Sequence, residues 1–423
     1  TPVTSNFQPG RDDWEFTNHG SVVEQGGICA GMSMTALYYN YRHTARMGFL
    51  NGRFSDLAGY DNDNAQGIRF ASAAQSDANV AWPTAGRVWL QQVQRLANAA
   101  HRHPDVVNFN STVVALYVTG RAVVFDMRGG TIAHVVVAYE ARANAILIAD
   151  VNDPGKSRTI SYVNNRFQPL PFSATAGANS TAMTRFTVMG ATTMVNLSAL
   201  DAEWQAFTQG TAGNSTFPAY QLQFRDALTG TWTRITRDTA TVFSDTLVAR
   251  VLCPRCPYLS NGISPADRQR VRIVDYRGAL MGEDDGAPFG AEVRLDSLRQ
   301  KLGVVREGWD ANADGLFLDF SWITVRAMPT RINRRNAGVF VDTLESFAAT
   351  HRGTHPAGAK YRWIFRDGRG ADTIQRTPGD STVAYCFRRT GTYTVKVDLV
   401  LSSGVMSGFT QVSVCGGTNG VRE

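Results

Sequence analysis

A single cysteine, Cys29, stands where a loop passes into a helical pattern. It follows the pair Gly26-Gly27, and the apolar residues after it recur at spacings of three and four, as on one face of a helix: Ala30, Met34, Leu37, Tyr38 and Tyr41. At the N-terminus of a helix, the macrodipole and the unpaired N–H groups favour a thiolate. The pattern therefore suits a thiol nucleophile, although it also suits a buried structural cysteine.

Cysteine catalysis also requires an imidazole that accepts and returns the proton, and a group that orients this imidazole. His134 lies within the apolar run 131–139, where a polar side chain without a partner is costly. The next run ends at Asp150, and a hairpin of this length brings Asp150 near His134. Asp150 can then hold one ring nitrogen and leave the other facing Cys29. Asn152 is the alternative third member, and a core histidine is the alternative role for His134.

The elements around these residues predict an α+β domain over 1–198. Helical periodicity covers 30–47 and 87–101, and short β-branched runs follow at 113–118, 122–127, 132–139, 145–150, 160–163 and 186–189. Helices followed by strands are typical of an α+β domain. Strand runs between 220 and 325, with one expected helix at 291–302, predict a β-sandwich domain over 199–328. Alternating strands predict a second sandwich over 329–423.

The other four cysteines can pair with one another and leave Cys29 over. We expect the disulfides Cys253–Cys256 and Cys386–Cys415, which imply an oxidising compartment. Half of a zinc site is the alternative for Cys253 and Cys256, but no second ligand pair follows at metal spacing.

The only cofactor that the residues suggest is calcium. Asp310, Asn312 and Asp314 alternate as in the first half of a calcium loop, and a plain polar turn is the alternative. Ser321 stands where an EF-hand would carry a glutamate, so the EF-hand interpretation fails.

Charge and hydropathy narrow the partners. The net charge is +6, but the basic residues are scattered among acidic ones, which argues against a nucleic-acid surface. No run reaches the roughly 18 apolar residues of a membrane span. Together with the expected disulfides, this favours a secreted or cell-surface protein.

Three segments resemble the papain-like cysteine peptidases, and bacteriocin-processing peptidases among them. They are 26–33 (Gly-Gly-Ile-Cys-Ala-Gly-Met-Ser), 134–139 (His-Val-Val-Val-Ala-Tyr) and 150–155 (Asp-Val-Asn-Asp-Pro-Gly). The resemblance covers about 1–195 and implies Cys29 as nucleophile, His134 as base and acid, and Asp150 as the orienting residue. Papain relatives place a glutamine six residues before the cysteine, where this chain has Val23. Gln25 and Asn18 are the nearest candidates for the oxyanion donor.

The last 60 or so residues resemble a polycystic-kidney-disease-type (PKD) immunoglobulin-like repeat. The resemblance rests on 361–368 (Tyr-Arg-Trp-Ile-Phe-Arg-Asp-Gly) and 391–397 (Gly-Thr-Tyr-Thr-Val-Lys-Val). Such modules bind, space or tether catalytic domains outside the cell. Together the resemblances imply a secreted peptidase that hydrolyses peptide bonds of a protein or peptide substrate through an acyl-enzyme. The alternative is a non-catalytic surface, adhesion or self-assembling protein on a peptidase-like scaffold, because a fold does not fix a function.

Overall fold

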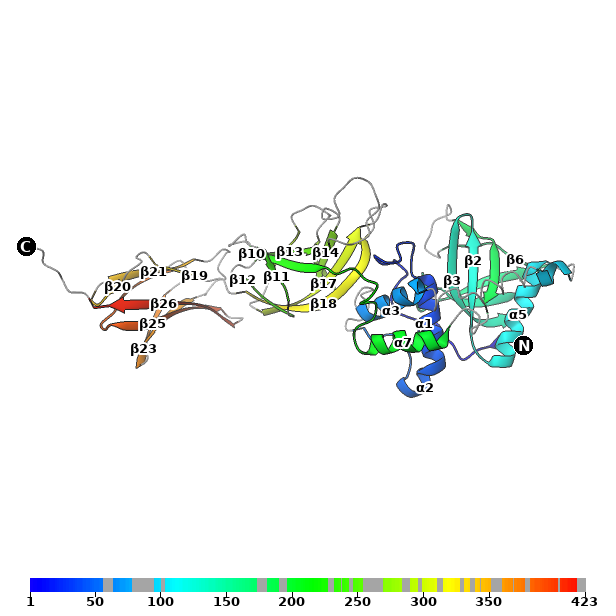
Figure 1. Cartoon of the computed structure of the whole chain (residues 1–423), viewed down its shortest axis with the longest axis horizontal. Coiled ribbons are helices and arrows are strands. Elements are labelled where there is room, and N and C mark those ends of the chain that lie inside the picture. Colours follow the sequence, from blue (N-terminus) through cyan, green and yellow to red (C-terminus); the bar gives the residue numbers. More distant parts are fainter. Residues whose placement is uncertain are drawn as a thin grey trace, which may run out of the picture. The chain divides into compact units, whose positions relative to one another are not determined.

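The structure, a computed structural model, divides the chain into two compact units, and each is described here by itself (Figure 1). The first unit comprises Thr1–Ala219, Cys253–Arg268 and Val305–Phe320, and the second comprises Tyr220–Leu252, Gln269–Val304 and Ser321–Glu423. The structure describes residues 1–55, 64–77, 95–99, 103–172, 181–189, 196–226, 232–236, 238–242, 246–253, 269–283, 290–295, 299–309, 315–327, 331–334, 339–342, 344–350, 360–367, 369–376, 381–401 and 404–416. The expected boundaries at 198 and 328 do not coincide with the two units and stay predictions about folding domains.

The first unit sets helices beside one antiparallel sheet, so its architecture is α+β. The helices are α1 (Cys29–Arg42), α2 (Thr44–Met47), α3 (Ala65–Ser76), α5 (Pro104–Thr119) and α7 (Leu197–Thr208). The sheet runs in the order β6-β5-β4-β3-β2-β9, and β1 pairs with β3. Its strands are β1 (Val3–Thr4), β2 (Val123–Gly129), β3 (Ile132–Arg142), β4 (Ala145–Ala149), β5 (Ser157–Val163), β6 (Arg166–Phe167) and β9 (Arg185–Met189). A further pair, β7 (Leu170–Pro171) and β8 (Ala182–Met183), lies off this sheet.

The run 113–118, which we predicted to be a strand, is instead the second half of helix α5. Pro104 occupies the first turn, the His103 ring caps it by accepting from the N–H of Asp105 at 3.2 Å, and Gly120 ends it with φ 63°. The buried positions, Phe109, Thr112 and Leu116 among them, recur every three or four residues. The caps and this period outweigh the strand preference of the valines, because tertiary packing overrides propensity.

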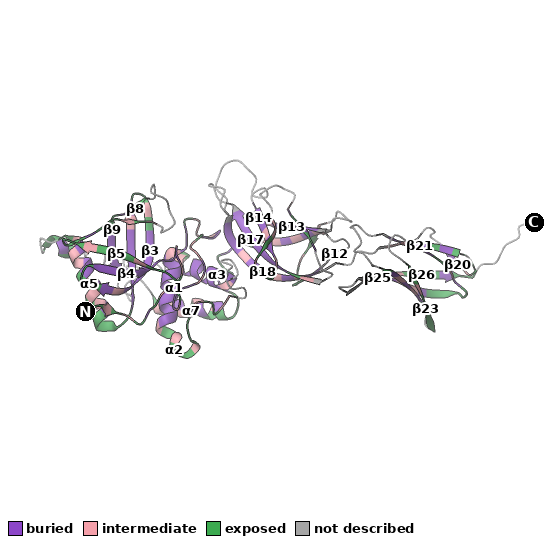
Figure 2. Ribbon diagram, turned by 180° about the vertical axis from the view of Figure 1, so that it is seen from behind, coloured by how far each residue is buried: buried purple, intermediate pink, exposed green. Residues whose placement is uncertain are grey.

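The helix that begins at Cys29 packs closely on its neighbours. Met32, Met34 and Leu37 are fully buried, as is most of strands β3 and β4 (Figure 2). A methyl group on Gly31 would lie 1.9 Å from the Ala71 carbonyl oxygen, so glycine is what allows α1 to approach α3 this closely. The expected helix over 30–47 is confirmed, with a break at His43 between α1 and α2.

The second unit is built from β-sheets, as we predicted for this part of the chain. One pair of sheets has the orders β11-β10-β13-β16 and β12-β18-β17-β14-β15, and the other has β19-β21-β24 and β20-β26-β25-β22-β23. The strands are β10 (Gln221–Asp226), β11 (Trp232–Arg234), β12 (Thr239–Val242), β13 (Thr246–Leu252), β14 (Gln269–Val274), β15 (Leu280–Glu283), β16 (Ala291–Arg294), β17 (Arg299–Trp309), β18 (Gly315–Ala327), β19 (Arg331–Arg334), β20 (Val339–Phe340), β21 (Leu344–Thr350), β22 (Lys360–Asp367), β23 (Gly370–Arg376), β24 (Thr382–Cys386), β25 (Gly391–Leu401) and β26 (Gly404–Cys415). Strands β17 and β18 straddle the division between the units.

Two expectations about this part of the chain are wrong. The described residues of the range 291–302 do not form the expected helix, since they belong mainly to β16 and to the start of β17. Alternating burial at Ala291 and Val293 explains the strand, because alternation is the period of a sheet. The expected Cys386–Cys415 disulfide is not formed: both thiols are free. The two cysteines end strands in different sheets, and the Val341–Asp342 backbone bonds to Cys415 on one side and to Phe387 on the other.

Candidate active site

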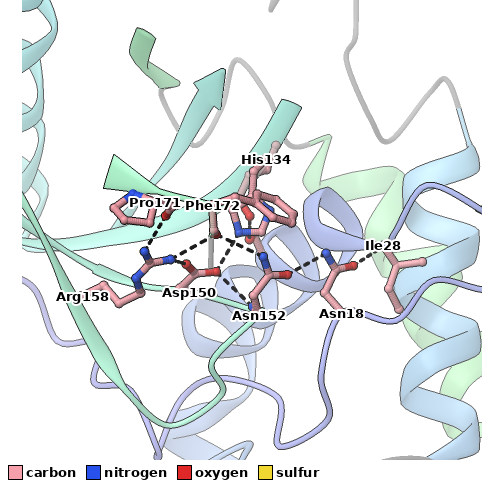
Figure 3. A network of polar contacts seen from close by, with 10 residues as sticks. Asn18, Ile28, His134, Asp150, Asn152, Arg158, Pro171 and Phe172 are labelled. Carbon is pink, nitrogen blue, oxygen red and sulfur yellow. Dashed lines mark hydrogen bonds and ion pairs between the residues drawn. The ribbon is translucent and has the colours of Figure 1, made fainter. Parts of the chain in front are cut away.

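His134 and Asp150 form a buried hydrogen-bonded pair. Strands β3 and β4 are antiparallel with Val137 opposite Ala149, so the residue that follows β4 returns beside the first half of β3. The Nε2 atom of His134 lies 2.7 Å from Oδ1 of Asp150, and neither side chain has any exposed surface (Figure 3). A buried carboxylate next to an imidazole favours the protonated ring and fixes its orientation. The hairpin therefore performs the positioning that its sequence predicted.

Further contacts hold the Asp150 carboxylate in place. The N–H of Asn152 donates to its Oδ1 at 3.0 Å, and the guanidinium of Arg158, on β5, forms an ion pair with its Oδ2. Burial raises the pKa of Asp150, but the hydrogen bond to His134 and the contacts with Asn152 and Arg158 outweigh it, and the pKa lies below its usual value. Asp150 therefore stays a carboxylate while His134 carries its proton.

Cys29 approaches the other side of the His134 ring. Cys29 is the first residue of α1 and is half-buried. Burial lowers the pKa of His134, but hydrogen bonds to Asp150 and Cys29 and the charges of both groups raise it to about 9. Among the described residues, Nδ1 of His134 has no well-aligned hydrogen-bond partner. The ring thus presents Nε2 to the carboxylate and keeps Nδ1 for exchange of a proton with the thiol.

The loop before Cys29 is fixed by two amide side chains. Asn18 accepts from the N–H of Ile28 at 2.5 Å and donates to Oδ1 of Asn152 at 3.0 Å, which joins this loop to the turn after Asp150. Gln75, on α3, donates to the carbonyl of Gly27 at 2.7 Å and accepts from the N–H of Gly31 at 3.0 Å. The start of α1 is therefore braced from both sides.

An aromatic ring covers His134. The Phe172 ring lies edge-to-face on the His134 ring, with centroids 5.1 Å apart and an interplanar angle of 72°. Arg158 holds this segment, since it donates to the carbonyls of Phe172 at 3.2 Å and Pro171 at 2.6 Å (Figure 3). One guanidinium thus connects the Asp150 carboxylate with the segment whose Phe172 ring packs on His134.

The structure places the remaining predicted residues as follows. The Asn152 side chain does not hold the imidazole: its oxygen accepts from Asn18 and its amide reaches the Phe172 carbonyl at 3.5 Å. The Asn18 oxygen and one of its N–H groups already form hydrogen bonds within the same network. Gln25 is half-buried in the loop before the helix. The choice of an oxyanion donor between them stays a prediction. The N–H groups of Cys29 and Ala30 belong to the first helical turn, where the helix itself supplies no acceptor.

Parts of the expected metal site and of the expected disulfide sites lie outside the residues that the structure describes. Asp310, Asn312 and Asp314 lie outside the described residues, as does Cys256, so the calcium turn and the Cys253–Cys256 disulfide stay predictions. Among the residues that the structure describes, no group of three acidic, histidine or cysteine side chains could hold a metal ion. None of the described helices is both long and apolar enough to cross a membrane.

Three residues of the network were not predicted from the sequence: Gln75, Arg158 and Phe172. Gln75 lies one residue before the end of α3, and Arg158 is the second residue of β5. Neither segment contains a sequence motif. A weak signal existed for Arg158 alone, because on an antiparallel neighbour of β4 it pairs with Ile148, two residues before Asp150.

Comparison with known proteins gives no family for the chain. No family model and no curated protein matches it. Among solved structures, the PKD domain of the human VPS10 domain-containing receptor SorCS2 is 17% identical, covers 22% of this chain and 76% of its own, and has a TM-score of 0.19. A segment of two fibronectin type III domains from chicken tenascin is 14% identical, covers 40% of this chain and 93% of its own, and has a TM-score of 0.21. Such low TM-scores carry no argument about function.

Proposed function

We propose that the chain is a secreted or cell-surface cysteine peptidase with a papain-like first unit. One observation carries the proposal: His134 lies between Cys29 and Asp150, with Nε2 on the carboxylate and Nδ1 left for the thiol. A helix that begins with the cysteine and an antiparallel sheet that bears the histidine and the aspartate supply the three groups that thiol catalysis needs. The reaction requires no metal in this arrangement of residues.

The chemistry follows from the geometry. In the resting pair the proton of the Cys29 thiol already lies on Nδ1 of His134, and the sulfur attacks the carbonyl carbon of a peptide bond as a thiolate. The N–H groups of Cys29 and Ala30 can donate to the oxygen that becomes negative. His134 then gives its proton to the leaving amine as the C–N bond breaks, which leaves a thioester on Cys29. Water, deprotonated by His134, attacks this acyl-enzyme, and the carboxylic acid departs as the thiol is restored.

The buried carboxylate makes this cycle possible near neutral pH. The imidazolium that forms in each proton transfer has no exposed surface, and an isolated buried charge would be costly. Asp150 offsets that cost, while Arg158 and the Asn152 N–H keep Asp150 ionised. The charges thus alternate along the line Arg158, Asp150 and His134.

The direct test is active-site labelling with a peptide-like epoxide. Native protein should react once, at Cys29, and lose activity on a pool of fluorogenic peptides. Cys29→Ala should neither react nor cleave, while Cys415→Ala, which removes an exposed free thiol, should behave like the wild type. Labelling of native Cys29 no faster than Cys415, together with no cleavage of any peptide, would favour the non-catalytic scaffold instead.

Attack on a side-chain amide would form the same thioester and release ammonia, and an amine could replace water in the second step. The product therefore defines the reaction. Mass spectrometry of a cleaved peptide in ¹⁸O-water should show one ¹⁸O atom in the new carboxylate, as hydrolysis requires. Transfer to an added amine without incorporation of ¹⁸O would identify a transpeptidase that uses the same three residues.

A further inference from the structure

A pocket of about 260 Å³ lies in the last β-structure of the second unit. It opens where the β22–β23 hairpin meets β24 and the start of β25. The hairpin pairs Asp367 with Gly370 and Phe365 with Asp372, and β24 carries Tyr385. All of these elements belong to one unit and to the described residues, and none contributes to the candidate active site.

The floor of the pocket is aromatic and firmly packed. The rings of Phe365 and Tyr385 are parallel within 3° with centroids 3.8 Å apart, and Phe387 links Tyr385 to Tyr393 through edge-to-face contacts. The Tyr385 hydroxyl donates to Asp372 at 2.5 Å. A floor of this kind is preorganised, so a ligand need not order it on binding.

Both carboxylates of the pocket are already engaged. Asp372 accepts from Tyr385, and Asp367 accepts from the N–H groups of Arg369 at 2.8 Å and Gly370 at 2.9 Å. The hydrogen bond from the Arg369 N–H lowers the pKa of Asp367. The Asp367 carboxylate therefore remains charged and stabilises the turn of the hairpin. Neither carboxylate forms an ion pair with an arginine of the rim within the described residues.

The rim carries three arginines. Arg388 pairs with Asp342 at 3.2 Å, but the side chains are 77% and 67% exposed, so the pair adds little. For Arg369 and Arg389, the described residues provide no ion-pair partner. In addition to the Arg369 N–H, the charges of both arginines reach Asp367 and help to lower its pKa, but neither guanidinium is held in an ion pair by a described residue, so both can face an anion above the aromatic floor.

We propose that this pocket binds a carboxylate-bearing sugar, such as one uronate residue of an acidic polysaccharide. The planar fork of a guanidinium matches a carboxylate in two parallel hydrogen bonds. The volume suits one sugar ring, whereas a bare phosphate would leave most of it empty. Tyrosine rings can pack on the C–H face of a sugar while their hydroxyls meet its polar edge. The last domain would then hold the chain on an acidic matrix.

The experiment titrates the full chain, as Cys29→Ala, with oligomers of galacturonate, neutral dextran and sulfated dextran, and follows binding by calorimetry. Galacturonate should bind, with an affinity that falls as salt rises, and neutral dextran should not. Arg369→Gln with Arg389→Gln should weaken binding at least tenfold. Arg366→Gln is the matched control, because Arg366 is exposed on the same hairpin but outside the pocket, and it should bind like the parent.

Three outcomes would overturn the proposal. They are no binding of galacturonate, equal binding of neutral dextran, or an equal loss in Arg366→Gln and in the double variant. Binding of sulfated dextran with tenfold higher affinity than galacturonate would also reject the carboxylate as the recognised group. None of these results depends on peptidase activity, so the two proposals stand or fall separately.

Discussion

Replacing Asp150 by asparagine removes the charge beside His134 while the side-chain volume hardly changes. An asparagine oxygen can still accept from Nε2 at the observed 2.7 Å, so the ring should keep its place. What is lost is the compensation for burial, which by itself pulls the pKa of His134 below its usual value of about 6.5. The substitution therefore tests whether charge, rather than packing, maintains the site.

The expected size follows from the pKa of His134. A pKa of about 9 leaves roughly 97% of the ring protonated at about pH 7.5, whereas a pKa of about 6.5 or less leaves roughly 10% or less. The hydrogen bond and the charge of Cys29 also raise this pKa and remain in the variant, so we expect a fall of up to about two pKa units. Such a fall corresponds to as much as about 3 kcal/mol less stabilisation of the imidazolium. The population of a thiolate–imidazolium pair, and with it alkylation of Cys29 at this pH, should drop severalfold, up to about tenfold where the whole shift is lost.

The assay combines two readouts. An NMR titration of the His134 ring measures its pKa, and the rate of alkylation of Cys29 by iodoacetamide is followed from pH 5 to 10. Asp126→Asn is the matched control, because Asp126 is buried on β2 and interacts with His134 through charge without a hydrogen bond. It should lower the His134 pKa by less than Asp150→Asn does. A folded Asp150→Asn protein whose His134 pKa falls no further than in this control would refute the reasoning.

Three further outcomes are expected. Replacing Arg158 by methionine should raise the pKa of Asp150, because a neighbouring cation is lost. Asp150 then becomes neutral at a higher pH, so alkylation of Cys29 should begin to fail at a higher pH, with partial recovery in Arg158→Lys. An unchanged acid limb of the alkylation profile would contradict this. Stability in urea should decrease between about pH 6.5 and 9 by on the order of 3 kcal/mol, since the folded state binds the His134 proton more tightly than the unfolded chain does, and His134→Gln should flatten that dependence. Gly31→Ala should destabilise the first unit by about 2 kcal/mol or more. The added methyl group would lie 1.9 Å from the Ala71 carbonyl oxygen, and the cost of this overlap is larger than the roughly 1 kcal/mol that alanine gains over glycine in a helix. An unchanged urea midpoint would show that α1 and α3 can separate.

The local parts of the candidate site could be predicted from the sequence. A cysteine before a helical pattern and a histidine and an aspartate on consecutive strands are short-range features, since a hairpin fixes which residues meet. The choice of Asp150 over Asn152 also followed from the strand end, and in the structure Asp150 is the residue that holds Nε2 of His134. The pairing of His134 with Asp150 needed no knowledge of how distant segments pack, whereas the approach of Cys29 to His134 was expected from the family resemblance.

The distant parts could not be predicted, because nothing in a sequence reports which remote side chain fills a vacant hydrogen bond. Gln75 reaches Gly27 and Gly31 from another helix, and Asn18 reaches Asn152 across more than 130 positions, at 3.0 Å. The prediction of a strand over 113–118, which lies in the helix at 104–119, was wrong for a related reason. The valines of this helix favour a strand, and burial against the sheet, together with the caps at Pro104 and Gly120, selects the helical period.

The brace around Cys29 also explains why the nucleophile and its base can stay in register although they come from separate layers. Cys29 lies on a helix and His134 on a strand, and a shift of about 1 Å between such groups is enough to lower a rate severely. Ser33 donates to the carbonyl of Val135 at 3.0 Å, which joins the second turn of α1 to the strand directly beside His134. Because Asn18 and Asn152 make a second connection on the Asp150 side, the two layers are fixed at two points. Movement of either layer alone would therefore break these two hydrogen bonds before it separated the sulfur from the ring.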